Sequence, residues 1–287
     1  MKKVIFVSDI HLSHNPPSLR HEEPDWYEAM RRVLCELRML QRRLDAIVLC
    51  AGDVFDAWNS PPELINFAIE QLPKMYAIPG QHDLPYHNYE KIEQSAYWTL
   101  VEAGVVTNIE PGAYIEAHGY KIHGFPYGFP LVPNEKKDDD IHIALVHSYC
   151  WIDGKSHDTA SEKTNLRNYE ISGYDFVAFG DNHIGFVSGN VINCGGMFRR
   201  TKTDMNRNPF VGVLVDNKIK KHLIDCSQDV YSLQDEQVKV NFNEFLHDIK
   251  ELEDIAGKDI KDIIIDYCKL LDNRIAKILI ETLEECS

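Results

Sequence analysis

The sequence is short of positive charge. Its 287 residues carry 30 Lys and Arg against 45 Asp and Glu, which gives a formal net charge of −15 at pH 7. A protein that wraps nucleic acid through its overall field needs the opposite sign, so this balance argues against that mode of binding. To bind an anionic partner, the chain would need a metal-filled acidic site or a basic partner subunit.

Long hydrophobic runs and paired cysteines are also missing. No stretch approaches the roughly 18 consecutive apolar residues of a membrane span, and Met1-Lys2-Lys3 leads into a strand pattern instead of a signal-peptide core. The seven cysteines are scattered and contain no C-x-x-C pair, which favours reduced core thiols over a disulfide framework or a zinc site. We therefore expect a cytoplasmic globular protein with no membrane association.

Apolar runs alternate with helical patterns along the chain. Residues 25–44 have the three-to-four spacing of an amphipathic helix, Pro61 and Pro62 open a second helix, and residues 88–103 predict a third. Strands are predicted at 4–7, 46–50, 74–78, 105–109, 141–146, 175–179 and 191–194, and hairpins at 113–125 and 211–224. This alternation indicates right-handed crossovers and a largely parallel sheet.

Carboxylate, amide and imidazole side chains follow the predicted strands. Asp9 and His11 follow the first strand, and residues two apart in an extended segment point to the same face, so this pair can bind one ion. The second strand ends at Asp53, which we expect at the centre of a metal site. Further strands end in Gln81, His82 and Asp83, in His147, and in Asp181 with His183. Because parallel strands place their carboxyl ends at one edge of a sheet, we expect these side chains to converge.

In their order along the chain, these residues resemble the motifs of the calcineurin-like metallophosphoesterase superfamily. The motifs are Asp9-x-His11, Gly52-Asp53 with Asp56, Gly80-Gln81-His82-Asp83, His147 and Gly180-x-x-His183. The resemblance spans residues 4 to 226 and implies an α/β fold, a four-layer αββα sandwich with a two-metal site. Within the superfamily the chain is most similar to the SbcD-type nuclease subunit of double-strand-break repair complexes. The supporting segments are Ser8-Asp9-Ile10-His11-Leu12, Ile78-Pro79-Gly80 and Gly196 to Arg200.

The resemblance implies a ligand set for each of two divalent ions. One ion would be held by Asp9, His11, Asp53 and His183, and the second by Asp53 as the bridge, Gln81, His147 and Asp181. Gln81 stands where the family has Asn, and Asp181 stands where it has His, so the occupancy of the second site is left open. Both replacements offer an oxygen ligand, which favours Mn²⁺ first and Mg²⁺ second over zinc.

The resemblance also implies catalytic roles. His82 would contact the scissile phosphate and protonate the leaving oxygen, and Asp83 would orient its ring. Asp56 is expected to support the site without binding a metal. Arg199, Arg200 and His14 are candidate substrate-binding residues, with solvated surface positions as the alternative reading.

These expectations describe a metal-dependent phosphodiesterase that hydrolyses DNA by two-metal activation of water. The resemblance implies an exonuclease in DNA repair or recombination, with endonuclease action left open. It implies a coiled-coil SMC-like ATPase subunit as partner and leaves a homodimer open, with the helix at 25–44 as one candidate interface. Two alternatives stay open: a phosphoesterase of a small molecule or phosphoprotein, and a phosphoesterase-fold scaffold that has lost its metals.

The character of the sequence changes after Asp225. We assign residues 1–226 to the phosphoesterase domain and residues 227–287 to a small C-terminal helical extension. Three runs in this extension carry apolar stripes at helical spacing, with a candidate cap at Asn241 or Asn243 and an end at Gly257. The extension either packs on the core as a cap or binds a partner.

Overall fold

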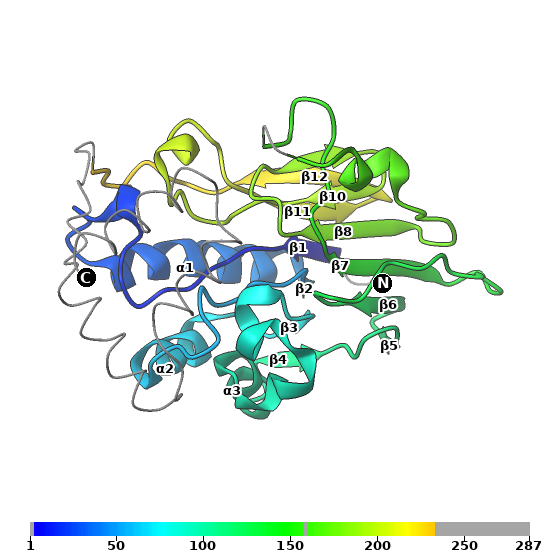
Figure 1. Cartoon of the computed structure of the whole chain (residues 1–287), viewed down its shortest axis with the longest axis horizontal. Helices are drawn as coiled ribbons and strands as arrows, with labels where there is room; N and C mark the ends of the chain where they lie inside the picture. Colours follow the sequence, from blue (N-terminus) through cyan, green and yellow to red (C-terminus); the bar gives the residue numbers. More distant parts are fainter. Residues whose placement is uncertain (1–2, 158–159, 233–287) are drawn as a thin grey trace, which may run out of the picture. The chain divides into compact units, whose positions relative to one another are not determined.

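The computed structural model describes residues 3–157 and 160–232, which belong to one compact unit. Two six-stranded sheets form its centre, and both contain parallel and antiparallel pairs (Figure 1). This is the two-sheet α/β sandwich that the sequence predicts. The helices predicted beyond residue 240 lie outside the described residues.

The first sheet has the strand order β12-β11-β1-β2-β3-β4. Its parallel strands are β1 (Lys3–Val7), β2 (Ala46–Cys50), β3 (Met75–Ala77) and β4 (Val106–Asn108), and the hairpin β11 (Phe210–Val215) and β12 (Lys218–Leu223) extends it antiparallel to β1. Val7 pairs with Cys50, so the chain leaves β1 and β2 at neighbouring points of the same edge. All of β2, and β1 after the exposed Lys3, are apolar and buried, as expected for strands that are covered on both faces.

The second sheet has the order β5-β6-β7-β8-β10-β9. Its strands are β5 (Tyr114–Ala117), β6 (Tyr120–Phe125), β7 (Ile141–His147), β8 (Phe176–Gly180), β9 (Phe186–Ser188) and β10 (Val191–Asn193). The run β6-β7-β8-β10 is parallel, and His147 at the end of β7 pairs with Gly180 at the end of β8. The three-residue strand β9 is absent from the sequence prediction.

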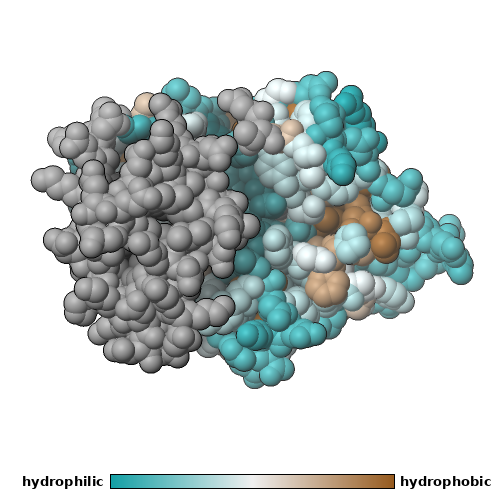
Figure 2. Space-filling model, in the orientation of Figure 1, coloured by the Kyte–Doolittle hydropathy of each residue, from teal (hydrophilic) through white to brown (hydrophobic). Residues whose placement is uncertain are grey.

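Three apolar layers hold the sandwich together. Helices α1 (Trp26–Leu44), α2 (Pro62–Gln71) and α3 (Ala96–Glu102) pack on one face of the first sheet, and a second cluster fills the space between the sheets (Figure 1). The third cluster covers the outer face of the second sheet with loop residues such as Leu131 and Ile152 and with Leu166 of the short 3₁₀ turn η6 (Leu166–Asn168). The turn η5 (Glu162–Thr164) precedes η6 and has no buried residue. In the described residues this outer layer is therefore irregular, and apolar surface gathers over the second sheet in the space-filling view (Figure 2).

The helix predicted over residues 88–103 is interrupted. Residues Tyr89–Gln94 form the 3₁₀ helix η4, and α3 begins only at Ala96. Ser95 separates the two because its backbone is extended and its hydroxyl accepts a hydrogen bond from Trp98 N, as an N-cap does. The apolar spacing predicts the buried face, but the N-cap at Ser95 divides the predicted helix in two.

None of the helices within residues 3–157 and 160–232 has both the length and the hydrophobicity that a membrane span requires.

A buried ion-pair network joins the loop after β1 to the last described residues. Arg20 is 1% exposed, and its guanidinium contacts Glu23 at 2.6 Å and Asp229 at 2.9 Å. Glu23 also accepts hydrogen bonds from Arg32 and from Val230 N. The network therefore fixes the segment after β12 to the core.

Arg20→Met should lower the free energy of unfolding by about 3 kcal/mol, because it leaves buried carboxylates without their main partner. Urea denaturation of the full chain measures this loss. The double variant Arg20→Met/Glu23→Gln should lose less than the sum of the two single variants, since the charges are coupled. Additive losses would show that Arg20 and Glu23 have no coupling free energy.

A second buried polar group predicts acid sensitivity. His123 is 8% exposed, and its Nε2 lies 2.9 Å from His142 Nδ1. Burial, together with the charges of His142 and Lys121, lowers the pKa of His123 to about 4. The folded state therefore favours the neutral ring, and the stability it contributes is complete above pH 6.5 and is lost as the pH falls toward 4.

His123→Leu should remove this pH dependence. The native chain should lose about 3 kcal/mol more than the variant between pH 6.5 and pH 4, from the size of the pKa shift. Urea denaturation at a series of pH values measures the difference, with His118→Asn in the exposed β5–β6 turn as control. Parallel stability curves for native chain and variant would contradict the assignment.

Candidate metal centre

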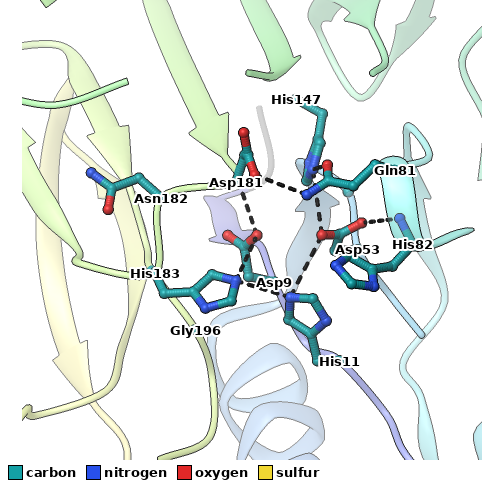
Figure 3. Close-up of polar contacts among 12 residues, drawn as sticks. Asp9, His11, Asp53, Gln81, His82, His147, Asp181, Asn182, His183 and Gly196 are labelled. Carbon is teal, nitrogen blue, oxygen red and sulfur yellow. Dashed lines mark hydrogen bonds and ion pairs between the residues drawn. The ribbon is translucent and has the colours of Figure 1, made fainter. Parts of the chain in front are cut away.

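The predicted site residues come together where the two sheets meet at the carboxyl ends of their parallel strands. Figure 3 shows side chains from both sheets pointing toward a common centre. They follow β1 (Asp9, His11), β2 (Asp53), β3 (Gln81, His82), β7 (His147) and β8 (Asp181, His183). The convergence expected from the strand order is therefore present in the structure.

Several of these residues adopt backbone conformations that L-amino acids avoid. Asp9, His11, Asp53 and Asp181 have φ values of 50°, 49°, 54° and 77°. Such left-handed conformations cost free energy and persist where the surroundings fix them, often at functional sites. The side chains of these residues point toward the centre of the site (Figure 3).

Two buried carboxylates form the floor of the site. Asp53 Oδ1 accepts a hydrogen bond from His82 N at 2.9 Å, and Asp9 Oδ1 accepts one from Asp181 N at 2.9 Å. The other oxygens, Asp53 Oδ2 and Asp9 Oδ2, are buried and have no hydrogen-bond partner. A buried acceptor without a partner is costly, so these two oxygens fit a bound cation.

Histidine nitrogens face the unpartnered oxygens. His11 Nε2 and His147 Nε2 each lie 3.5 Å from Asp53 Oδ2, and His11 Nε2 lies 3.0 Å from His183 Nε2. His147 Nδ1 donates to the carbonyl of Ala51 at 2.6 Å. Because a carbonyl only accepts, this bond fixes a proton on Nδ1, so Nε2 is the nitrogen that would bind a metal after it loses the proton that it donates to Gln81 Oε1 here.

The electrostatics of the site favour a positive charge at the centre. Burial lowers the pKa of His147, but the charge of Asp53, with those of Asp9 and Asp181, outweighs it and raises the pKa to about 10. Burial likewise raises the pKa of Asp53, but His147, His11 and His82 together hold it well below its usual range. A divalent cation satisfies the same carboxylates without protonating a ligand.

The two residues that depart from the family pattern contact each other. Gln81 Nε2 donates to Asp181 Oδ1 at 2.9 Å, and Gln81 Oε1 lies 2.6 Å from His147 Nε2 (Figure 3). The longer Gln81 side chain thus directs its carbonyl oxygen toward His147 and its amide toward the carboxylate of Asp181. The amide of Gln81 therefore donates to the carboxylate of Asp181, and the extra methylene of Gln81 lets it reach that carboxylate.

Three groups of side chains have ligand atoms close enough to share an ion. Their atoms lie within 4.8 Å of one another in each group, which are Asp9, His11 and His183; His11, Asp53 and His82; and Asp9, Asp53 and His147. The first and third groups share Asp9, and the second and third share Asp53. The donor set therefore fits more than one ion held around the two buried carboxylates.

A family model described as calcineurin-like phosphoesterase matches residues 2–185, well over half of the chain. The chain belongs to this family. Calcineurin-like phosphoesterases are metal-dependent hydrolases, and the clusters above supply the ligands for such ions.

Solved structures with low sequence identity show partial likeness. The chain is similar to the calcineurin-like phosphoesterase YfkN from Bacillus subtilis, with 12% identity over 80% of this chain and 92% of that chain and a TM-score of 0.45. It is similar to a putative 5'-nucleotidase from Staphylococcus aureus, with 11% identity over 78% of this chain and 53% of that chain and a TM-score of 0.48. A search of curated proteins found no match.

The structure corrects the role expected for Asp83 in this phosphoesterase. Its carboxylate accepts hydrogen bonds from the backbone N–H groups of Gly80, Val54 and Phe55 at 3.0, 3.1 and 2.9 Å, so it joins the loops after β2 and β3 instead of orienting His82. Burial, followed by the charge of Asp53, raises the pKa of Asp83 to about 7 against these three donors. The ring of His82 is oriented by the carbonyl of Asp56, which accepts from its Nδ1 at 2.8 Å.

A cavity of about 840 Å³ opens over the metal centre of the phosphoesterase. Its lining includes His82, Lys155 and Arg200, along with His11, Asp56 and His183. Lys155 comes from the loop after β7, where the sequence offered no motif. Its place in the cavity depends on the path of that loop, which local patterns do not encode.

Of the three candidate substrate-binding residues, only Arg200 lines the cavity. Arg199 instead donates from Nε to the carbonyl of Arg207 at 2.6 Å and from its guanidinium to Tyr231. His14 Nδ1 bonds Tyr27 at 2.8 Å. Neither Arg199 nor His14 is among the residues that line the cavity, so their predicted substrate contact is not found in the described residues.

Asp56 connects Arg200 to the metal centre. Its Oδ1 lies 2.6 Å from Arg200 Nη2 and 3.2 Å from His11 Nδ1. Burial raises the pKa of Asp56, but His11 and Arg200 outweigh it and hold the carboxyl well below its usual range. The Asp56 carboxylate therefore lies beside His11 Nδ1, on the side of the ring opposite Nε2, without forming a hydrogen bond to it.

Asp56→Asn should weaken Mn²⁺ binding by about 10- to 100-fold, the usual effect of removing the group that supports a metal-ligating histidine. Equilibrium titration with Mn²⁺ measures the affinity. Asp216→Asn in the β11–β12 turn is the control, since it makes the same change of side chain outside the site. Unchanged affinity in Asp56→Asn would mean that His11 needs no support from this carboxylate.

Proposed function

We propose that this protein is a metal-dependent phosphodiesterase that hydrolyses DNA phosphodiester bonds. We propose that it acts as an exonuclease in repair or recombination. As its partner we propose a coiled-coil SMC-like ATPase subunit. The motif resemblance to SbcD-type nucleases supports this choice of substrate and partner. The observation that carries the chemistry is the pair of unpartnered buried oxygens, Asp9 Oδ2 and Asp53 Oδ2, below an open cavity.

We propose a ligand set for each of two ions, and the clusters of donor atoms around Asp9 and Asp53 support it in part. Asp9, His11, Asp53 and His183 would hold one ion, and Asp53, Gln81, His147 and Asp181 would hold the other. Two such ions supply an activated water and a clamp on the phosphoryl oxygens. Because Gln81 and Asp181 contribute oxygen, we propose Mn²⁺ as the physiological ion, with Mg²⁺ as the second choice.

His82 is the proposed proton donor to the leaving oxygen. Its Nδ1 keeps a proton because the Asp56 carbonyl accepts it at 2.8 Å, and the ring lines the cavity. Nε2 is then the atom that exchanges a proton with substrate. The backbone N–H of His82 also bonds Asp53 Oδ1, so the donor and the bridging carboxylate are fixed relative to each other.

Positively charged side chains line the cavity, although the chain as a whole is negatively charged. Arg200 and Lys155 lie on its lining, in a chain whose net charge is −15. Together with the bound ions, they supply the local positive potential that a polyanionic substrate requires. The cavity volume of about 840 Å³ lies within the range of ordinary ligand sites.

Hydrolysis of end-labelled single- and double-stranded linear DNA with Mn²⁺, Mg²⁺ or chelator tests the proposal. Cleavage should require Mn²⁺ or Mg²⁺ and should be absent with chelator. Assays with and without a candidate coiled-coil ATPase test the partner. Hydrolysis of 4-nitrophenyl phosphate without any DNA cleavage would favour a small-substrate phosphoesterase, and no hydrolysis of either substrate would favour a scaffold.

A further inference from the structure

The loop that follows the third motif exposes an aromatic side chain in a strained conformation. Tyr86 has φ 53° and His87 has φ 57°, and Tyr86 is 71% exposed. A positive φ is an outlier for a bulky aromatic residue and persists only where neighbouring contacts fix it. Here His87 Nδ1 bonds the carbonyl of Gln81 at 3.1 Å, and His87 N bonds the carbonyl of Leu84 at 3.0 Å.

A second aromatic ring accompanies Tyr86. The ring of Trp58 lies 5.4 Å from that of Tyr86, centroid to centroid, at an interplanar angle of 46°. Trp58 is half-buried and is anchored through its carbonyl, which accepts from Ala96 N at 2.7 Å. Lys91 Nζ lies 4.9 Å from the Tyr86 ring centroid, so a cation adjoins the pair.

Both rings are connected to the catalytic residues through short stretches of backbone. The hydrogen bond between His82 Nδ1 and the Asp56 carbonyl joins the two loops that carry them. Trp58 follows Asp56 by two residues, and Tyr86 follows His82 by four. An aromatic pair with an exposed tyrosine and a nearby lysine is thus carried by the two loops that the proposed proton donor joins.

We propose that Trp58 and Tyr86 form a stacking ledge for an unpaired nucleobase of the substrate strand. The inference rests on the proposed DNA substrate and extends it to a preference for single-stranded or frayed ends. Aromatic rings bind any base through its π face, and an adjacent cation attracts the backbone phosphates. A base inside a duplex has no free face to offer, so paired substrates would gain nothing from the ledge.

Binding of single-stranded oligonucleotides tests the ledge in the His82→Asn background with Mn²⁺, where cleavage is slow. Tyr86→Asn removes the ring but suits the left-handed backbone. It should weaken binding by about 5- to 100-fold, the effect of losing one base stack. Tyr114→Asn on edge strand β5 is the control, because Tyr114 is 50% exposed and has Lys121 Nζ 5.7 Å from its ring centroid.

A series of oligonucleotides with one abasic position each identifies the base. At one position of the strand, removal of the base should weaken binding by the protein that has Tyr86. The same abasic strand should bind Tyr86→Asn as tightly as the intact strand does. A 2-aminopurine at that position should lose fluorescence on binding only when Tyr86 is present. Equal binding of intact and abasic strands by both proteins would overturn the proposal.

Other ligands of the ledge give different results. A free mononucleotide that competes with the same affinity as the strand would overturn the assignment to a nucleic acid. Self-association that is lost in Tyr86→Asn, with DNA binding unchanged, would overturn it in favour of a protein contact. If the native chain cleaves DNA and Tyr86→Asn cleaves it with the same kinetics, only the ledge is contradicted. If the native chain hydrolyses 4-nitrophenyl methyl phosphate but does not cleave DNA, the proposed substrate is contradicted.

Discussion

Asp53→Asn should reduce phosphodiester hydrolysis by more than about 10³-fold, at or beyond the upper end of the effect of removing one preorganised electrostatic group. Asp53 faces both His11 and His147 through one unpartnered oxygen, so it is the only described side chain that contacts ligands of both proposed ions in this way. Asparagine keeps the shape and removes the charge. The loss should therefore appear in metal affinity and in rate together.

Thermal unfolding separates this effect from misfolding. Without metal, Asp53→Asn should unfold within a few degrees of the native chain, while added Mn²⁺ should stabilise only the native chain by mass action. Asp216→Asn, another aspartate at positive φ, should behave as native in both assays. Retained hydrolysis in Asp53→Asn, or Mn²⁺ stabilisation equal to that of the native chain, would contradict the bridging role.

His82→Asn should lower kcat by about 10²- to 10⁴-fold, the range of a general acid or base. Mn²⁺ binding should change little, because the ring of His82 lies near His11 and Asp53 but is not one of the proposed ligands, and its Nδ1 is bonded to the Asp56 carbonyl. The variant therefore separates catalysis from metal binding. Steady-state kinetics with a labelled oligonucleotide gives kcat and KM separately.

The leaving group provides the sharper test of His82. An ester with a 4-nitrophenolate leaving group needs no proton on departure, so His82→Asn should slow it far less than it slows DNA cleavage. His118→Asn, in an exposed turn, is the control. Equal losses on both substrates would assign His82 to substrate positioning instead of proton transfer.

The ligand positions could be predicted from sequence because they follow from strand ends. β2 is an apolar run buried on both faces, and such a run delivers the next polar residue, Asp53, to the sheet edge. The same reasoning placed Asp9, His147 and His183. What the sequence did not reveal is the left-handed backbone at Asp9 and Asp53, which depends on hydrogen bonds between loops, such as Asp9 N to the Gly52 carbonyl.

Residues whose partners come from distant segments were harder to predict. Arg199 and Arg200 are adjacent, yet Arg199 bonds Tyr231 in the segment after β12 and Arg200 contacts Asp56 in the loop after β2. Asp83 was assigned to the ring of its neighbour, but three backbone amides from two loops occupy its carboxylate. In both cases the deciding contact is tertiary and leaves no local pattern.

The number of Mn²⁺ ions bound per chain tests the central claim most directly. Equilibrium dialysis followed by metal analysis counts the ions, and electron paramagnetic resonance shows whether they are close enough to couple. We predict two coupled Mn²⁺ ions in the native chain and loss of coupling in His147→Ala. A single ion, or none, would contradict a two-metal centre and would mean that Gln81 and Asp181 do not complete the second site.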